Sequence, residues 1–318
     1  MKILRTQVNK NIIGLQGKTP RFHRTTDIRH LYQGEYGGVK LKRGDMEESI
    51  MKLGFIGCGN MANAIMHGII ANGLVAADQI IGSDPTEAGR QRTLQENGIH
   101  VTSDNLEVVR QAETVFFTIK PQYYAEMIAE IKDEIREDQL IISIAAGRTL
   151  DYIEEQFAPR QVKVVRLMPN TPAMVGEGMT AACPNKNVSE EELTYAVKIC
   201  DGFGKTEVVS EKLFDVVTAV SGSSPAYIFM LIEAMADAAV LGGMPRQQAY
   251  KFSAQSVLGS AKMVLETGKH PGELKDMVTS PAGTTIEAVR VLEERGFRSA
   301  VIECIDACAA KSEALRKG

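Results

Sequence analysis

Two patterns of hydrophobic and polar residues follow one another along the chain. Between residues 51 and 168, short apolar runs alternate with segments whose apolar positions recur at helical spacing. Runs such as Val115–Phe117 and Ile141–Ile142 are apolar throughout, as expected of strands that helices cover on both faces. Strands and helices that alternate over short connections predict a parallel sheet. The predicted strands are Met51–Gly57, Gln79–Asp84, Ile99–Val101, Thr114–Ile119, Gln139–Ile144 and Val162–Met168, which closes the series. The predicted helices are Asn60–Ala71, Thr86–Glu96, Gln122–Ile135 and Leu150–Phe157.

The pattern changes after about residue 211, where no further strands are predicted. The helix Ala226–Leu241 carries only Glu233 and Asp237 as charged residues, so it needs burial on more than one side. We therefore expect an α/β domain over residues 51–210 and an all-α domain over residues 211–318, whose surplus apolar surface forms a dimer interface. The predicted helices of the second domain are Leu213–Val220, Ala226–Leu241, Arg246–Thr267, Glu273–Val278, Thr285–Glu294 and Arg298–Ala314.

Residues 1–50 differ from the rest of the chain in charge. Residues 1–45 contain 10 Lys and Arg against 3 Asp and Glu, whereas the remainder contains 26 against 37. A basic, acid-poor segment is compatible with a transit peptide. We favour a disordered extension or an upstream translation start, because Met46 lies shortly before the first predicted strand and Met51 lies at its start. The acidic remainder argues against nucleic acid as a partner.

Composition narrows the class of protein further. The chain is 44% hydrophobic and 24% charged, and no apolar run reaches the roughly 18 residues that a membrane helix needs. The five cysteines are an odd number without a CxxC pair, which indicates neither a disulfide framework nor a zinc site. We expect a cytoplasmic protein with no bound metal and no membrane association.

A glycine-rich segment follows the first predicted strand. The strand ends at Ile56, Gly57 and Gly59 come next, and a helix opens before Ala62. Glycines let the backbone turn tightly and approach a pyrophosphate, which the unpaired N–H groups of the helix start can bind. The GxGxxA pattern alone is a weak signal, and a glycine-rich turn without a ligand is the alternative. Between a strand and a helix, however, the pattern predicts a Rossmann dinucleotide site. The predicted contacts are Ile56, Gly57, Cys58, Gly59, Asn60 and Met61.

The second predicted strand ends at Asp84, 27 residues after Gly57. An acid at this place usually binds the ribose hydroxyls of NAD, and it repels the 2′-phosphate of NADP. Arg90 and Arg92 lie on the following helix, where they can partly offset the charge. The alternative is that Asp84 is a solvated turn residue before Pro85.

The other strand ends complete the predicted cofactor site, because ligands of parallel sheets bind beyond the carboxyl ends of the strands. Lys120 can meet a phosphate or an acidic substrate, or it can be a surface lysine before a helix that starts with proline. Small residues after Ser143 let a cofactor pass closely. The residues predicted here are Asn105, Thr118, Ile119, Lys120, Pro121, Ile144, Ala145 and Ala146.

Several motifs resemble the pyrroline-5-carboxylate reductase family, whose members catalyse the last step of proline biosynthesis. The motifs are Phe55–Ala62, Lys120–Gln122, Arg166–Pro172, Ser221–Tyr227 and Leu274–Ile286, of which the last is the most diagnostic. They follow the family's order and span residues 51 to about 310. The resemblance implies a Rossmann domain followed by a helical dimerisation domain, in dimers that often assemble into rings of dimers.

The resemblance also implies the reaction, in which hydride passes from NADPH or NADH to the imine carbon of 1-pyrroline-5-carboxylate and gives L-proline. The loop Ser280–Thr285 leads into a helix, and the N–H groups of Gly283, Thr284 and Thr285 are suited to hold the substrate carboxylate. Thr285 matches the family threonine that is placed to hydrogen-bond the ring nitrogen, although in isolation it predicts only a helix cap. No strong general acid or base is evident, and we interpret His270 as structural. Because a protonated imine is already activated, the predicted catalytic role of Thr285 is to position the substrate and donate a hydrogen bond.

Two positions depart from the family pattern. Ala282 stands where the family usually has a second glycine, a change that matters only if this position needs a positive φ. Many relatives carry a neutral residue at the position of Asp84 and favour NADPH. The acid therefore leaves the choice between NADPH and NADH open.

Two other functions are compatible with parts of the sequence. A reductase acting on a β-hydroxy acid or ketopantoate typically has a catalytic lysine on a long helix of its second domain. Lys251 and Lys262 are the candidates for that role, but neither lies in a recognised motif. A non-catalytic dinucleotide sensor would retain only the binding function of the Rossmann half, and the intact block Ser280–Ile286 argues against it.

Overall fold

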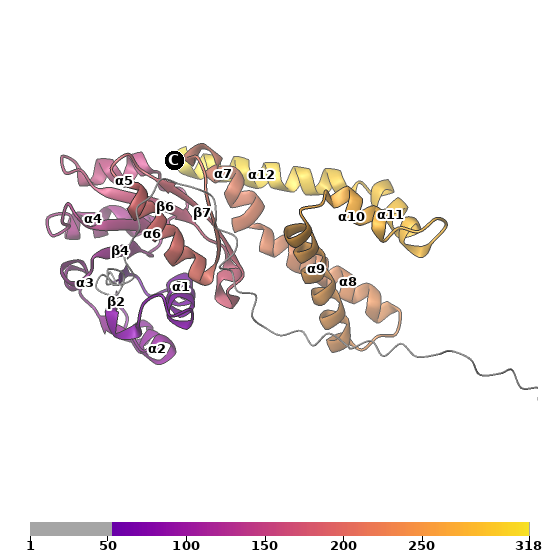
Figure 1. Ribbon diagram of the computed structural model, residues 1–318, viewed down its shortest axis with the longest axis horizontal. Helices are drawn as coiled ribbons and strands as arrows, with labels where there is room; N and C mark the ends of the chain where they lie inside the picture. The colour runs from indigo at the N-terminus through magenta and orange to yellow at the C-terminus, as the bar shows by residue number, and fades with distance from the viewer. Residues whose placement is uncertain (1–52, 318) are drawn as a thin grey trace, which may run out of the picture. The chain divides into compact units, whose positions relative to one another are not determined.

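Eight strands form one sheet in the part of the chain that the computed structural model describes, residues 53–317 (Figure 1). The predictions made for residues 1–50 lie outside the described residues. The strand order is β3-β2-β1-β4-β5-β6-β7-β8, and β1 through β6 are parallel, as predicted. The strands are β1 (Leu53–Ile56), β2 (Ile80–Ser83), β3 (His100–Thr102), β4 (Thr114–Phe117), β5 (Leu140–Ser143), β6 (Lys163–Met168), β7 (Gly178–Pro184) and β8 (Gly204–Val208).

The last two strands correct the prediction that Val162–Met168 closes the sheet. β7 runs antiparallel to β6, and β8 runs parallel to β7 at the edge. β7 is rich in small residues and ends at Pro184, while β8 carries Lys205 and Glu207 and is mostly exposed. Because strand preference depends on packing neighbours more than on the residues themselves, neither segment has a recognisable strand pattern.

Helices cover both faces of the sheet. On one face Phe116 and Ile142 pack with side chains of α1 and α6, and on the other Phe117 and Ile141 pack with α3, α4 and α5. α1 and α5 have their predicted bounds, whereas α3 and α6 were not predicted, and the first turn of the predicted helix at Gln122 is the 3-10 helix η3. The α-helices of this part are α1 (Asn60–Ala71), α2 (Glu87–Asn97), α3 (Asn105–Gln111), α4 (Tyr124–Ile131), α5 (Leu150–Phe157) and α6 (Glu190–Cys200). The 3-10 helices are η2 (Ala77–Gln79), η3 (Pro121–Tyr123), η4 (Thr171–Val175), η5 (Asp201–Phe203) and η6 (Glu211–Leu213).

After residue 211, the regular elements of the described residues are all helices, as predicted. The predicted helix Leu213–Val220 is in fact a short helix, α7, followed by a π-helical turn, η7. α8 packs along α9, and α12 returns to pack against α7 and η7 (Figure 1). The elements are α7 (Phe214–Val217), η7 (Thr218–Gly222), α8 (Ser224–Leu241), α9 (Arg246–Thr267), α10 (Pro271–Met277), α11 (Thr284–Glu294) and α12 (Phe297–Lys317).

The helices from α8 onward leave much apolar surface unpaired in a single chain. Ala236 is the buried residue of α8, while Phe229, Leu265 and Ile302 are 63%, 84% and 61% exposed. One stretch of the described residues, Glu211–Leu241, is long and apolar enough to cross a membrane by these two criteria alone. A second protein surface would remove the same side chains from water.

Candidate functional site

The glycine-rich segment lies where the ends of β1, β2 and β4 meet. Gly57 has a φ of 98° and its N–H donates to Ser83 O at 2.9 Å. A Cβ at this position would lie 2.7 Å from Ile119 Cγ2, so both the conformation and the space require glycine. The Thr118 hydroxyl donates to the carbonyl oxygens of Ile56 at 2.9 Å and Gly57 at 2.6 Å. The structure thus brings these predicted residues of β1 and β4 together.

The start of α1 is open to a ligand. Its N-cap is Gly59, which has no side chain to accept from the first N–H groups, and a Cβ there would meet nothing within 4 Å. By contrast, α2, α3, α5 and α6 each begin with a capping side chain of their own, from Thr86, Asp104, Thr149 and Ser189. An uncapped helix start at the switch between β1 and β4 suits an anion such as a diphosphate.

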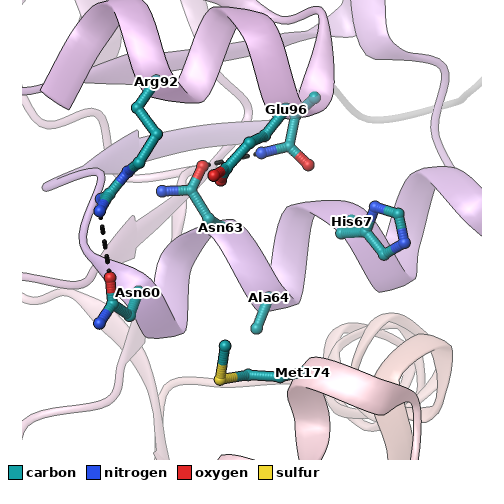
Figure 2. Close-up of a pocket in the computed structure, with 8 residues that line it drawn as sticks. Asn60, Asn63, Ala64, His67, Arg92, Glu96 and Met174 are labelled. Carbon is teal, nitrogen blue, oxygen red and sulfur yellow. Dashed lines mark hydrogen bonds between the residues drawn. The ribbon is translucent and has the colours of Figure 1, made fainter. Parts of the chain in front are cut away.

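The Asp84 carboxylate lies between the glycine-rich loop and the start of α2. Its Oδ1 accepts from the N–H and the hydroxyl of Thr86 at 2.9 and 2.7 Å, and its Oδ2 is 3.4 Å from the Cys58 N–H. Arg90 donates to the Asp84 carbonyl at 2.7 Å rather than to the carboxylate. Arg92 donates to Cys58 O at 2.9 Å and, as Figure 2 shows, to Asn60. The carboxylate is held in place but has no arginine partner among these contacts.

A cavity of about 270 Å³ opens beside this loop, at the ends of β1 to β4. Asn105 lines this cavity with a polar side chain. Its amide accepts from the Ser83 hydroxyl at 2.7 Å and donates to Glu130 at 2.8 Å. Glu126 and Glu130 of α4 line the cavity and were not predicted, because the pattern of the predicted helix Gln122–Ile135 does not specify which of its polar residues face the sheet end. The remaining lining residues are Gly57, Pro85, Ser103, Ile119, Tyr123 and Met127.

A larger cavity, of about 590 Å³, joins the ends of β4 and β5 to the helical part of the chain. Pro121 and Ala146 were predicted here, whereas Arg148 was not; its Nε donates to Pro121 O at 3.2 Å. Ile144 and Ala145 lie in the loop between β5 and this cavity, and Lys120 is exposed. The helical part contributes Thr218, Ser223, Cys308, Lys311, Ser312 and Leu315.

The predicted substrate loop lies elsewhere in the chain. Thr285 is the second residue of α11, whose N-cap is Gly283, so Thr285 is not the helix cap. A Cβ on Gly283 would overlap the Ser280 hydroxyl unless that side chain turned away. Ala282 has a φ of 56°. This position therefore does need a positive φ, and the change from the family's glycine to alanine affects the backbone of the loop. Neither cavity is lined by residues of Ser280–Ile286. A single chain therefore does not bring Thr285 to the predicted cofactor residues.

The environments of the cysteines and of the two candidate lysines, Lys251 and Lys262, do not suit a catalytic role. Burial and the nearby Asp84 carboxylate raise the pKa of the Cys58 thiol to about 12, so the thiol stays neutral. All five cysteines are unpaired, and the described residues contain no cluster that could hold a metal. Lys262 forms an exposed ion pair with Glu266 at 3.3 Å, and Lys251 is exposed on the same helix, which does not suit the catalytic lysine of a β-hydroxy acid reductase.

These features define a class of protein, an oxidoreductase with a Rossmann domain for a nicotinamide cofactor and a helical second domain. Two family descriptions match the chain: "NADP oxidoreductase coenzyme F420-dependent" over residues 52–147 and "Pyrroline-5-carboxylate reductase dimerisation" over residues 211–315. Pyrroline-5-carboxylate reductases of Escherichia coli and Methanosarcina acetivorans are 53% and 45% identical to the chain over 266 residues, 84% of this chain and 98% of each relative. The chain belongs to the pyrroline-5-carboxylate reductase family.

Solved structures agree with this assignment. The pyrroline-5-carboxylate reductase of Coxiella burnetii has a TM-score of 0.79 at 34% identity and covers 84% of this chain and 99% of its own. The Plasmodium falciparum enzyme, solved with NADP bound, has a TM-score of 0.76 at 32% identity, with 84% and 98% covered. The predicted fold class, the family and the NAD(P)H-dependent reductase class are confirmed, and the dimerisation domain supports self-association.

Proposed function

We propose that this protein reduces 1-pyrroline-5-carboxylate to L-proline. When bound, the nicotinamide cofactor would supply a hydride to the carbon of the protonated imine. The C=N π electrons then become the lone pair of the ring nitrogen, which keeps the proton it already carries and is left as a secondary amine. The observation that carries the proposal is the uncapped start of α1 at Gly59, beside the ends of β1 and β4, in a chain 53% identical to a pyrroline-5-carboxylate reductase.

The cofactor site extends along the sheet end in this proposal. The diphosphate binds at Gly57–Met61, and the adenosine half occupies the cavity that Asn105 and Ile119 line. Asp84 then accepts from the ribose hydroxyls, and together with Glu126 it disfavours the added 2′-phosphate. NADH is therefore the better substrate, unlike the usual preference of the family for NADPH.

The nicotinamide half lies toward the larger cavity, past Ile144–Ala146 and Lys120–Pro121. The substrate carboxylate binds the N–H groups of Thr284 and Thr285 at the uncapped start of α11. The predicted contact from Gly283 is corrected here, because the Gly283 N–H already donates to Ser280 O at 3.1 Å. The Thr285 hydroxyl hydrogen-bonds the ring nitrogen and orients the imine. The chain supplies binding and orientation, while the cofactor supplies the hydride.

Two chains are needed to assemble this site. The substrate loop lines neither cofactor cavity of its own chain, whereas the exposed apolar faces of α8 to α12 offer a large surface for a second copy. In a twofold dimer, each chain can present its Thr285 to the cofactor of its partner. Rings of such dimers follow if a further face of the helical domain also pairs.

The same interface accounts for the apolar stretch Glu211–Leu241 without a membrane. The net charge of the chain, -4, does not suit nucleic acid as a partner. Five unpaired cysteines suit a reducing compartment, so we place the enzyme in the cytoplasm.

Steady-state rates with racemic pyrroline-5-carboxylate, measured with NADH and with NADPH, test the proposal. We expect turnover with both cofactors and a higher kcat/KM with NADH. No reaction with either cofactor would refute the activity, and a tenfold or greater preference for NADPH would refute the role of Asp84 alone.

A further inference from the structure

We propose that Asn63 and Asn97 are positioning residues that hold the glycine-rich loop in the conformation that binds the cofactor. The proposal rests on the cofactor site described above, and it assigns a role to two side chains that do not themselves meet the cofactor. Figure 2 shows Asn63 on α1 directed toward α2, across a cleft of about 360 Å³ that Arg92 and Glu96 also line.

The amide of Asn63 binds two consecutive carbonyl groups of the loop. Its Nδ2 donates to Cys58 O at 2.9 Å and to Gly59 O at 3.0 Å, and the side chain is 7% exposed. In a trans peptide, the C=O of one residue and the N–H of the next lie in one plane and point in opposite directions. Holding the Cys58 and Gly59 carbonyls therefore fixes the N–H groups of Gly59 and Asn60, two of the donors that an uncapped helix start offers to a diphosphate.

Asn97 on α2 fixes the orientation of the Asn63 amide. Its Nδ2 donates to Asn63 Oδ1 at 2.7 Å, and the residue is 8% exposed. A 180° rotation of an asparagine side-chain amide exchanges the positions of its oxygen and nitrogen. The bond from Asn97 favours the orientation in which the Asn63 Nδ2 faces the loop. Arg92 adds a donor from the same helix, 2.9 Å from Cys58 O. α2 thus supports the loop through one buried amide and one exposed guanidinium.

Packing of two helices does not by itself account for these amides. Asn97 Oδ1 is buried and has no hydrogen-bond partner among the described residues. A buried acceptor without a partner costs stability, and a pair of apolar side chains in the same space would avoid that cost. The pair is explained by its link to the loop, because the Asn63 Nδ2 holds two loop carbonyl groups, which leucine cannot do, and Asn97 orients the Asn63 amide.

The variant Asn63→Leu tests the proposal, since it removes both donors at similar volume. Fluorescence titration should show the Kd of NADH rising about tenfold. The reason is that the loop, without its hydrogen bonds to Asn63, adopts the binding conformation in a smaller fraction of the protein. We expect kcat at saturating cofactor to stay within about twofold, because the reacting groups are untouched. The double variant Asn63→Leu/Asn97→Leu should show the same rise in Kd with little change in Tm, because it removes both members of the polar pair.

Asn72→Leu is the matched control. Asn72 lies at the other end of α1, and its Nδ2 also donates to two carbonyl oxygens, Gly68 O at 3.0 Å and Gly202 O at 2.8 Å. This variant should lower Tm and leave the Kd of NADH unchanged.

The outcomes separate positioning from stability. The proposal is overturned if the folded Asn63 variants bind NADH with a Kd within twofold of that of the unaltered protein. It is also overturned if the Kd of NADH rises equally in Asn72→Leu. If the single variant does not fold, the double variant decides by the same criterion. Failure of the unaltered protein to bind either cofactor would instead refute the cofactor site on which the proposal rests.

Discussion

At the scale of single residues, the substrate loop contains a backbone conformation that its sequence does not favour. Ala282 has a φ of 56°, in the left-handed region, where an L-residue with a Cβ is less stable than glycine by roughly 1–2 kcal/mol. The turn around it is closed by the bond from Gly283 N to Ser280 O at 3.1 Å. The loop therefore stores strain next to Thr285, at a position where the family usually has glycine.

Replacing Ala282 by glycine should stabilise the protein. We expect Ala282→Gly to raise the free energy of unfolding by about 0.5–1 kcal/mol, since the relief of strain exceeds the entropy that glycine adds to the unfolded chain. Differential scanning calorimetry would show Tm higher by about 1–4 °C. Ala261→Gly, within the regular helix α9, should lower Tm instead. A lower Tm for Ala282→Gly contradicts the prediction.

Asp84 is the residue that sets the cofactor preference in our proposal. The variant Asp84→Ser keeps an acceptor for Thr86 and the ribose but removes the charge. The ratio of kcat/KM for NADPH to that for NADH should rise about tenfold or more, because the 2′-phosphate no longer meets a carboxylate. Glu87→Ser, which removes an acid from the first turn of α2, is the control and should leave the ratio unchanged. The idea fails if both variants give the same ratio as the unaltered protein.

Thr285 should affect turnover and not cofactor binding. Losing one hydrogen bond to the reacting imine lowers kcat by about tenfold to a hundredfold in Thr285→Ala. The Kd of NADH, measured without substrate, should not change. Thr279→Ala is the control, since Thr279 lies just after α10 and its hydroxyl donates to Lys275 O at 2.6 Å. Unchanged turnover in Thr285→Ala would remove this residue from the site.

At the scale of elements, two of the family motifs join β6 to the start of the helical domain. Arg166 has a side chain 4% exposed, donates to Glu211 at 2.7 Å and lies over the Phe214 ring at 4.3 Å. Glu211 also accepts from Leu150 N at 2.8 Å. Asn170 donates to the carbonyl and hydroxyl oxygens of Ser221 at 3.2 Å each. These contacts explain the motifs Arg166–Pro172 and Ser221–Tyr227 as parts of one junction.

Breaking this junction should cost far more stability than breaking a surface pair. We expect Arg166→Met to lower the free energy of unfolding by about 2 kcal/mol or more, because Glu211 loses its cation in a partly buried place. Urea denaturation measures the change. Arg110→Met, which removes the exposed pair with Glu134 at 3.0 Å, should cost less than about 1 kcal/mol. Equal losses in the free energy of unfolding for the two substitutions would show that the buried pair stabilises the fold no more than the exposed pair does.

At the scale of the whole molecule, the proposed active site is shared by two copies of the chain. The apolar side chains of α8 to α12 are exposed in one chain, and the match to a dimerisation domain over residues 211–315 covers the same helices. The substrate loop belongs to these helices and the cofactor loop to the sheet domain. In our proposal, a dimer buries the apolar surface and completes the site in one step.

Mixed dimers test the shared site directly. Gly57→Val cannot bind the cofactor, because its Cβ meets Ile119, and Thr285→Ala cannot orient the substrate. After the two inactive proteins are unfolded together and refolded, half of the dimers are mixed, and one site in each has an intact cofactor loop and an intact threonine. Activity should recover to about a quarter of that of the unaltered enzyme, as a shared twofold site requires. Refolding each variant alone is the control. No recovery on mixing would place both residues in the same chain's site.

Periodicity predicted the elements that are long or apolar on both faces, and missed the others. The strand at Thr114 and the helix at Asn60 were predicted because their patterns are strong. β7, β8 and α3 were missed, since short segments take their structure from the neighbours against which they pack. α6 was missed although Ser189 and Glu192 form a capping box, which is a local signal of a helix start. Glu126 and Arg148 were missed in the same way, because only the fold turns them toward a cavity.

The sequence by itself determined the family, the strand–loop–helix unit at Gly57–Ala62 and the candidate loop at Ser280–Thr285, since glycine spacing and motif order are local properties of the chain. Only the tertiary structure decided that Ala282 adopts a positive φ, that the Asp84 carboxylate faces the Cys58 N–H, and that Asn63, oriented by Asn97, holds the loop carbonyls. The tertiary structure also separated Thr285 from the cofactor cavities of its own chain. These relations join residues distant in sequence, and no local pattern specifies which distant atoms will meet.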